Sequence, residues 1–469
     1  MRAGSAGIVW ALACLGALAC GVVCATVAGA AERPNIVLLY TDDQAQWGVG
    51  AYGNPDIHTP NMDRLARQGA RFANAFVVTP VCSPSRVSLI ASRYGTEVGI
   101  TDWINPRSET TLGLDPAIVT WPEVLAEAGY TNAIIGKWHL GTQPEFHPRH
   151  VGFSHFFGFL GGGNRPVNPR LEVEGTVKQL SGPLPDLLVD DAIGFLNRHR
   201  DRLFMLSVQF RAPHAPYAPV PEEDSAHYKG IEIRIPDYPG IKRARVEQLL
   251  REYYGSISSV DRNVGRLLRR LDELALTAKT VVIFTSDHGY NIGHRGIRHK
   301  GNGTWILEDR SGRRPNMFDT SLATPLIIRW PGVVEPGRVI TETISHLDFY
   351  PSILAMAGVE RPAGVIVRGR DFTPLLRGES VAWDNTLFGQ YDMHHGKVAR
   401  MRMIRTPEWK LIRHYEPGGQ DALYHLAEDP DERVNRIADP DQKSRIAALS
   451  QRLRAWQASI DDPLLREVR

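Results

Sequence analysis

Short apolar runs rich in β-branched residues alternate with helical patterns along most of the chain, and this alternation constrains the fold more than any other feature. The runs with strand character cover residues 36–40, 133–135, 204–210, 281–285 and 326–330. Strands separated by helices form a parallel or mixed sheet with helices packed on its faces. We therefore expect an α/β fold with a mostly parallel or mixed central sheet.

Helix signals lie between these strands. Thr59 and Pro60 supply a capping hydroxyl and a first-turn proline before residues 61–68, and Gly69 ends that helix. A similar helix is predicted over residues 122–128. A long helix is predicted over residues 243–274, where apolar residues recur at helical spacing.

The pattern changes from about residue 380. Four short strands are predicted over residues 386–390, 399–405, 410–415 and 422–426, with turns in place of crossover helices. A last helix carries its apolar residues on one face, and these are Ile446, Leu449, Leu453 and Trp456. We expect a catalytic domain over residues 31–379 and a smaller subdomain over residues 380–469, built from an antiparallel sheet and one helix.

The N-terminus has the pattern of an export signal. Arg2 is the only charge before Glu32, residues 8–27 are apolar, and Ala28-Gly29-Ala30 offers small residues for cleavage. A signal peptide over residues 1–30 predicts a periplasmic or secreted protein, and an uncleaved membrane anchor is the alternative. Of four cysteines, three lie in this segment, so the mature chain keeps Cys82 alone. A lone cysteine in an exported protein is either an inert buried thiol or a functional residue.

The charge balance narrows the choice of partners. The chain has 54 basic and 52 acidic residues, a formal net charge of +2. Nucleic-acid or membrane-surface binding needs a basic excess gathered on one face. We expect neither a nucleic-acid partner nor stable membrane association. Gly161-Gly162-Gly163 lacks the continuation of a phosphate-binding loop and is interpreted as a plain loop.

Chemically active residues follow four of the predicted strands. Asp42 and Asp43 follow the first strand, Lys137 and His139 the second, His214 the third, and Asp287 and His288 the fourth. Open α/β sheets bind ligands beyond the carboxyl ends of their strands, so this convergence predicts a site. Adjacent carboxylates suit a hard divalent cation such as Ca²⁺, with Asp287 and His288 as further ligands. The alternative is a pair of solvated turn carboxylates.

The run Cys82-Ser83-Pro84-Ser85-Arg86 has the pattern of a helix start. Free N–H groups at a helix N-terminus stabilise an anion or a nucleophile placed there. Arg86 lies one turn on and can direct two donors back toward residue 82. A capped helix with a surface arginine and a simple thiol nucleophile are the alternatives.

This run resembles the signature of the type I, formylglycine-dependent sulfatases of the alkaline phosphatase superfamily. Further matches are Pro34-Asn35-Ile36 through Asp43, Gly136-Lys137-Trp138-His139-Leu140-Gly141, Pro213-His214, Ser286-Asp287-His288-Gly289 and His299-Lys300-Gly301. The chain departs from the family in three places. Ala91-Ser92-Arg93 replaces the usual Thr-Gly-Arg, His288 replaces a frequent Asn, and residues 301–318 form an inserted polar loop.

The resemblance implies an alkaline-phosphatase-like fold and a complete catalytic apparatus. A maturation enzyme would convert Cys82 to formylglycine, and the ligands of one Ca²⁺ (Mg²⁺ or Mn²⁺ being possible) would be Asp42, Asp43, residue 82, Asp287 and His288. The other catalytic residues implied by the resemblance are Arg86, Lys137, His139, His214 and Lys300.

Three functions compete at this point. Hydrolysis of a saccharide or small-molecule sulfate ester is the first. A phosphonate or phosphate monoester hydrolase on the same scaffold is the second, and an inactive carbohydrate-binding homologue is the third. Residues 103–114, 157–169 and 301–318 are the loops that we expect to set substrate specificity.

Overall fold

The computed structural model describes residues 33–467, and the predicted signal peptide lies outside that range. Within residues 33–467, no helix is both long and apolar enough to cross a bilayer.

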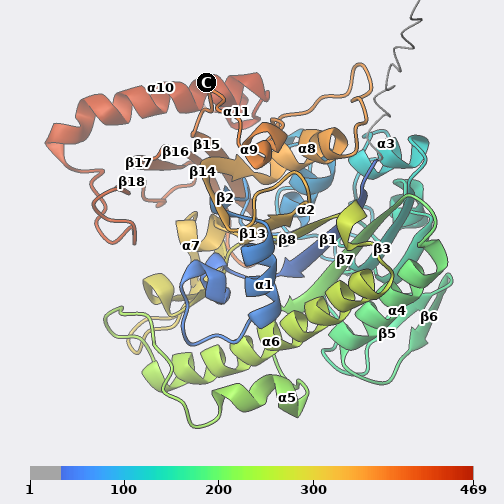
Figure 1. Ribbon diagram of the computed structural model, residues 1–469. Helices are drawn as coiled ribbons and strands as arrows, with labels where there is room; N and C mark the ends of the chain where they lie inside the picture. Colours follow the sequence, from blue (N-terminus) through green and yellow to red (C-terminus); the bar gives the residue numbers. More distant parts are fainter. Residues whose placement is uncertain (1–32, 468–469) are drawn as a thin grey trace, which may run out of the picture. The chain divides into compact units, whose positions relative to one another are not determined.

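A ten-stranded mixed sheet forms the centre of the fold (Figure 1). Its strands in spatial order are β14 (Arg338–Ser345), β2 (Ala70–Phe76), β13 (Leu326–Arg329), β8 (Thr280–Ser286), β1 (Asn35–Asp42), β7 (Phe204–Pro213), β3 (Thr131–Lys137), β4 (His155–Phe159), β5 (Arg170–Val173) and β6 (Thr176–Gln179). Strands β8, β1, β7, β3 and β4 run parallel, whereas β13, β5 and β6 are antiparallel to their neighbours. The expected α/β sheet is confirmed, and each of the five predicted strands corresponds to a strand of this sheet.

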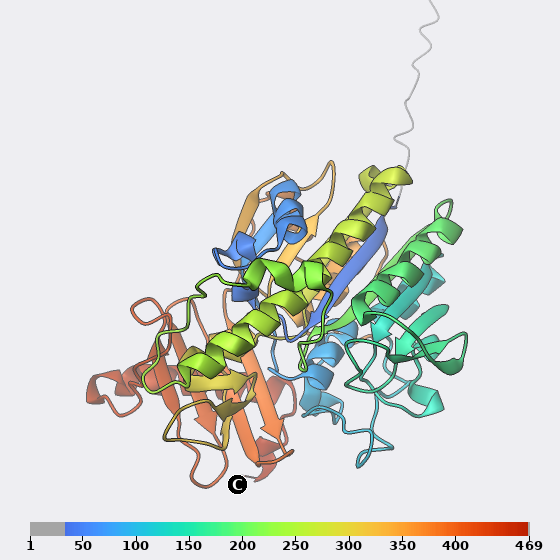
Figure 2. The same ribbon diagram turned by 90° about the horizontal axis from the view of Figure 1, so that it is seen from below.

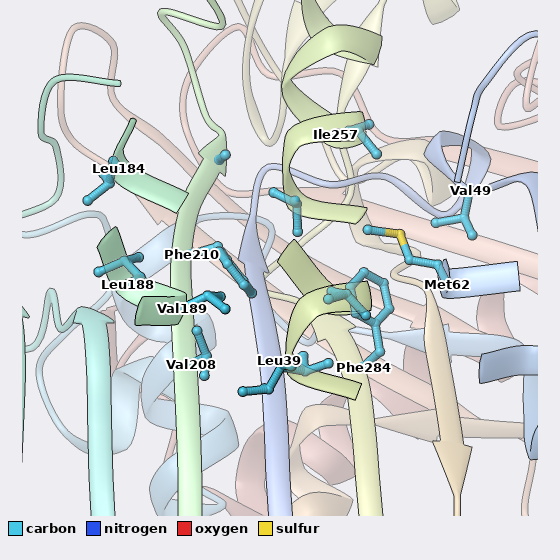
Figure 3. Packing of buried hydrophobic residues seen from close by; sticks show 14 of the residues in the cluster. Leu39, Val49, Met62, Leu184, Leu188, Val189, Val208, Phe210, Ile257 and Phe284 are labelled. Atoms are coloured by element: carbon cyan, nitrogen blue, oxygen red, sulfur yellow. The ribbon is translucent and has the colours of Figure 1, made fainter. Parts of the chain in front are cut away.

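Helices cover both faces of the sheet because β1 is apolar on both of its faces. Val37 and Leu39 pack on one face among α1 (Pro60–Gln68), α4 (Leu184–His199) and α6 (Arg243–Glu273). Figure 3 shows part of this core, and in Figure 2 the yellow-green α6 lies between α1 and α4.

The opposite face of the sheet forms a second core. Ile36, Leu38 and Tyr40 pack there. The helices on that side are α2 (Cys82–Ala91), α3 (Trp121–Glu127), α8 (Phe349–Met356) and α9 (Thr373–Arg377). A strand that is apolar on both faces is typical of a parallel sheet covered on both sides.

Helix α2 is buried along its whole length. All ten of its residues are buried. The Ser83 hydroxyl accepts a hydrogen bond from the Ile104 N–H, and the Ser85 hydroxyl donates to the carbonyl of Asp287. Side-chain hydroxyls therefore fasten the first turn of α2 to two neighbouring segments.

One capping prediction is wrong. The Thr59 hydroxyl does not accept from the first turn of α1. It accepts from the Gly50 N–H at 2.8 Å and donates to Asp63 at 3.2 Å. The Thr59 hydroxyl, which the sequence pattern assigned to the start of α1, therefore binds the backbone of the preceding loop at Gly50 instead.

Residues 301–318 are not a loop, which corrects a second prediction. They contribute two strands to a four-stranded antiparallel sheet made of β9 (Asn291–Ile292), β10 (Ile297–His299), β11 (Asn302–Trp305) and β12 (Arg313–Pro315). Each strand has at most four residues, too few for a clear alternating pattern in the sequence. The short helix α7 (Asp319–Leu322) follows.

The C-terminal residues form a third sheet, as predicted. Its antiparallel strands are β15 (Leu387–Met393), β16 (Ala399–Arg405), β17 (Trp409–His414) and β18 (Ala422–His425). Helix α10 (Lys443–Ser459) packs on it through Leu449, Leu453 and Trp456. The remaining helices are α5 (Glu222–Ser225) and α11 (Leu464–Glu467). The domain boundary at residue 380 stays a prediction.

Candidate active site

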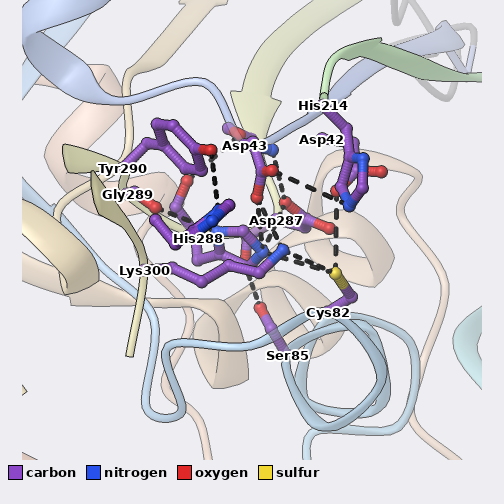
Figure 4. Close-up of polar contacts among 12 residues, drawn as sticks. Asp42, Asp43, Cys82, Ser85, His214, Asp287, His288, Gly289, Tyr290 and Lys300 are labelled. Atoms are coloured by element: carbon purple, nitrogen blue, oxygen red, sulfur yellow. Dashed lines mark hydrogen bonds and ion pairs between the residues drawn. The ribbon is translucent and has the colours of Figure 1, made fainter. Parts of the chain in front are cut away.

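The carboxyl ends of neighbouring parallel strands bring predicted residues together, and Figure 4 shows Asp42, Asp43, His214, Asp287 and His288 among them. Strand β1 ends at Asp42, and Asp43 follows with a left-handed backbone (φ 67°). Thr41 pairs with Ser286 on β8, so Asp287 emerges beside the two aspartates. Lys137 is the last residue of β3, and His214 follows β7. The predicted convergence is therefore present in the fold.

Three buried carboxylates each face one cation. The Lys137 Nζ lies 2.7 Å from Asp42 Oδ2, and the Lys300 Nζ lies 2.6 Å from Asp43 Oδ1. Arg86 pairs with Asp287 at 3.1 Å. These residues are almost inaccessible to solvent. Such pairs act in a medium of low polarity, where an unpaired charge is costly.

Burial and pairing move the carboxyl pKa values in opposite directions. Burial alone would raise the pKa of Asp42, but Lys137 holds it well below its usual range. Lys300 likewise overcomes burial and lowers the pKa of Asp43 to about 2. Burial, reinforced by the charge of Asp42, raises the pKa of Asp287 to about 7 despite Arg86. Asp287 is thus the least compensated of the three carboxylates.

His288 directs an unprotonated ring nitrogen toward these carboxylates. Its Nδ1 lies 2.9 Å from the carbonyl oxygen of Gly289, so the ring N–H is assigned there and Nε2 keeps a lone pair. Burial lowers the pKa of His288, which favours this neutral form. Nε2 lies 3.2 Å from Asp287 Oδ1 and 3.4 Å from Asp43 Oδ1. An acceptor nitrogen facing two carboxylate oxygens can share a divalent cation with them, and the ligand atoms of Asp42, Cys82, Asp287 and His288 lie close enough together to hold one.

Cys82 lies at the edge of the same group. It is the first residue of α2 and is 2 % exposed. Its Sγ lies 3.0 Å from Lys300 Nζ, 3.5 Å from His288 Nε2 and 3.7 Å from Asp42 Oδ1. Residue 82 therefore touches both the lysine and the possible metal ligands.

Lys300 lies close to residue 82, as the motif order predicts. It follows β10, although the inserted segment made its alignment ambiguous. Burial would lower the pKa of Lys300, but Asp43 raises it well above its ordinary value. An ammonium group therefore stands beside the sulfur of Cys82.

Arg86 behaves differently from its sequence prediction. Its guanidinium binds Asp287 and the Gln209 Oε1 at 2.9 Å, and also approaches the Lys137 carbonyl at 3.3 Å. These three contacts direct it toward the carboxylate rather than back to Cys82. Sequence analysis missed Gln209, which lies inside a predicted strand and gives no local signal.

His139 is held with one nitrogen unpaired. Its Nε2 lies 3.0 Å from the carbonyl oxygen of Ile104, whereas its buried Nδ1 has no partner within residues 33–467. Burial, followed by Lys137, lowers the pKa of His139 well below its usual value. The ring is therefore neutral and can accept a proton at Nδ1.

His214 lies on the solvent side of the possible metal ligands. Its Nε2 is 3.8 Å from Asp43 Oδ2, its Nδ1 is 2.7 Å from the Ala215 carbonyl oxygen, and its side chain is 30 % exposed. Burial lowers the pKa of His214 to about 4, even though Asp42 and Asp43 favour the charged form. It is the most accessible of the predicted site residues described above.

The chain matches two protein families. Residues 34–359 match the Sulfatase family, and residues 312–459 match the family "N-sulphoglucosamine sulphohydrolase, C-terminal". The first match covers more than half of the chain and contains every predicted site residue.

Proteins named as sulfatases are similar to this chain over most of its length. The N-acetylglucosamine-6-O-sulfatase of Bacteroides thetaiotaomicron is 26% identical, over 92% of this chain and 87% of that protein. The N-acetylgalactosamine-6-sulfatase of Canis lupus familiaris is 30% identical, over 87% of this chain and 82% of the relative. A solved structure of a protein in complex with its substrate D-glucosamine-2-N,6-O-disulfate superposes with a TM-score of 0.79, at 25% identity, over 92% of this chain and 99% of that one. The chain belongs to the sulfatase family and hydrolyses sulfate esters.

Proposed function

We propose that this sulfatase removes sulfate from a sulfated saccharide, with Cys82 oxidised to formylglycine and a divalent cation, Ca²⁺ by preference, bound beside it. The observation that carries the proposal is the position of Cys82 Sγ, 3.0 Å from Lys300 Nζ and 3.5 Å from His288 Nε2. The relatives support the saccharide, because two of them are named for 6-sulfated N-acetylhexosamines.

The cation would be held by Asp42, Asp43, Asp287 and His288, together with residue 82. Hard carboxylate oxygens dominate this set, which suits Ca²⁺ and leaves Mg²⁺ and Mn²⁺ as alternatives. When bound, the cation supplies positive charge to the sulfate oxygens, where negative charge is spread during hydrolysis.

Formylglycine at residue 82 would supply a hydrated aldehyde with two hydroxyls, one as the nucleophile toward sulfur and one whose deprotonation would accompany the release of sulfate. Lys137 and Lys300 add positive charge around the sulfate. Lys300, or His214 in its protonated form, donates a proton to the alcohol oxygen as its bond to sulfur breaks. His139 accepts a proton from the second hydroxyl through its unpaired Nδ1. One water would be consumed for each sulfate released, because the aldehyde at residue 82 would have to be hydrated again.

Two partners follow from this chemistry. A formylglycine-generating enzyme must act on the motif 82–86, where the core Cys-x-Pro-x-Arg is intact although Ala91-Ser92 departs from the family. Export through the predicted signal peptide would deliver the enzyme to sulfated saccharides outside the cytoplasm.

Mass analysis and sulfate release test the proposal together. The chain, produced with a formylglycine-generating enzyme, should give a peptide containing residue 82 as an aldehyde, and it should release sulfate from members of a panel of sulfated saccharides. Cys82→Ala should release none. Turnover by Cys82→Ala would refute the role of residue 82, and exclusive turnover of aryl sulfates or aryl phosphonates would refute the saccharide.

A further inference from the structure

A second cavity of about 400 Å³ lies between the β11–β12 hairpin and the C-terminal sheet. In Figure 2 the yellow hairpin lies beside the orange and red strands of that sheet. We call this cavity the cationic groove, because its walls include Trp305, Arg310, Arg313, Arg314 and Lys397. Its size is within the range of small-molecule sites, roughly 300–1,000 Å³.

The positive charges of the groove are uncompensated. Within residues 33–467, Arg310, Arg313, Arg314 and Lys397 form no ion pair with a carboxylate. Glu416 is the only acidic residue of the lining, and it pairs with Arg400 instead. Four like charges in one concavity repel one another and attract an anion.

The arginines are held in place without an acid. The guanidinium carbons of Arg310 and Arg314 lie 4.6 and 4.1 Å from the centre of the Trp305 ring. Arg314 also donates to the Arg295 carbonyl at 2.6 Å, and Arg313 donates to the Asn302 carbonyl at 3.1 Å. Stacking and carbonyl contacts fix the donors while leaving their charge available to a ligand.

The groove adjoins the catalytic centre through its Asn316 wall. The Asn316 side chain donates to the carbonyl oxygen of Lys300 at 2.9 Å, and the Lys300 Nζ lies 3.0 Å from Cys82 Sγ. One lysine side chain therefore separates residue 82 from the backbone that borders the groove.

A second link runs through the β15–β16 turn, which carries Lys397. In the same turn, the backbone N–H groups of His394 and His395 donate to the Asp102 carboxylate at 3.0 and 3.1 Å. Two residues after Asp102, the carbonyl of Ile104 lies 3.0 Å from His139 Nε2. The turn thus joins the groove to the segment that positions His139.

We infer that the cationic groove binds a second anionic group, a sulfate or a uronate carboxylate, of the same saccharide whose scissile sulfate lies at residue 82. The substrate class is then an acidic saccharide with at least two anionic groups rather than a neutral sugar with one sulfate. This inference rests on the proposed function and narrows its substrate.

Binding to the full-length Cys82→Ala chain tests the groove independently of turnover. The probe is a heparin-derived tetrasaccharide, titrated by calorimetry at low salt. Arg310→Gln with Lys397→Gln removes two exposed charges that have no backbone contact, and should raise Kd about 3- to 20-fold. The matched control is Lys178→Gln with Arg269→Gln, which removes an exposed charge from β6 and another from α6 and should change Kd less than about twofold.

Binding of a desulfated tetrasaccharide that keeps its uronates shows whether the groove recognises a sulfate or a carboxylate. If the groove pair still weakens its binding relative to the control, the groove recognises carboxylate, and if not, it recognises sulfate. The inference is overturned if the parent chain does not bind the tetrasaccharide, if both double variants lose affinity equally, or if neither does. Tighter, groove-dependent binding of an eight-nucleotide oligothymidylate would also overturn it. Failure of the proposed function looks different, because the wild-type chain would then release sulfate from no saccharide.

Discussion

Gly162 lies against the ring of His139, and its substitution tests the proposed proton acceptor. A Cβ at residue 162 would lie 2.4 Å from Cε1 and 2.5 Å from Nε2 of His139. Ordinary contact begins near 3.4 Å, so in Gly162→Ala the imidazole must recede by about 1 Å. The ring is buried and its Nε2 is bound to the Ile104 carbonyl, so it cannot move without breaking that contact.

The expected loss is large in rate and modest in stability. A displacement of about 1 Å in a catalytic group costs on the order of 100-fold in rate, and we expect kcat to fall by about that factor while KM changes little. Loss of the hydrogen bond to Ile104 should lower the free energy of unfolding by about 1 kcal/mol. The protein should therefore stay folded and bind its substrate, but turn over slowly.

Gly163→Ala is the matched control, because a Cβ there meets no atom within 4 Å. Sulfate release from an aryl sulfate gives kcat for both variants, and the effect of Gly162→Ala is measured again in a His139→Ala background. In that background Gly162→Ala should cause no further loss of kcat, since the two residues act as a unit. Full kcat in Gly162→Ala, an equal loss in Gly163→Ala, or an undiminished loss in the His139→Ala background would refute the reasoning.

Three further predictions concern stability. Arg402 is buried between Asp392 and Asp462, so Arg402→Ala should leave both carboxylates without their cation. The free energy of unfolding should fall by about 3–5 kcal/mol, measured as a lower urea midpoint. A decrease below about 1 kcal/mol would contradict this reasoning. Burial would raise the pKa of Asp319, but Lys410 and then Arg405 hold it well below its usual range, so its stabilising effect is present above about pH 4 and is lost as the pH falls further. Wild-type Tm should thus fall more steeply on acidification than that of Asp319→Asn, and parallel curves would oppose the assignment. Chelation by EGTA should lower Tm and activity. Free Ca²⁺ at 100 times its Kd should then raise the free energy of unfolding by about 2.7 kcal/mol in the wild type but not in Asp287→Asn, and a wild-type Tm indifferent to EGTA would exclude Ca²⁺.

The residues at the strand ends could be predicted because the signal is local. Strand β1 is marked by continuous apolar residues, and the polarity changes abruptly at Asp42. The parallel arrangement then brings the carboxyl ends of β1, β8, β7 and β3 together, whatever the loops do. Most of the predicted site follows from that single rule.

The remaining features depend on contacts between distant segments. The preference of Arg86 for Gln209 and Asp287 is decided by packing across the sheet. Gly162 looked like part of a plain loop, since its constraint is a ring 23 positions earlier in the chain. The β11–β12 hairpin looked like an insertion because its strands are short and polar, and its pairing partners become visible only in the fold.

If Cys82 is converted as proposed, the burial of α2 decides when that conversion can take place. Cys82 is 2 % exposed at the start of a helix in which every residue is buried. A second protein can oxidise the Cys82 sulfur only if it can reach it, and in the folded chain that sulfur is buried. Under the proposed chemistry, conversion must therefore precede closure of the fold, and a chain that folds first is trapped with its thiol. The yield of active enzyme would then depend on the rate of oxidation relative to the rate of folding, rather than on the amount of protein made.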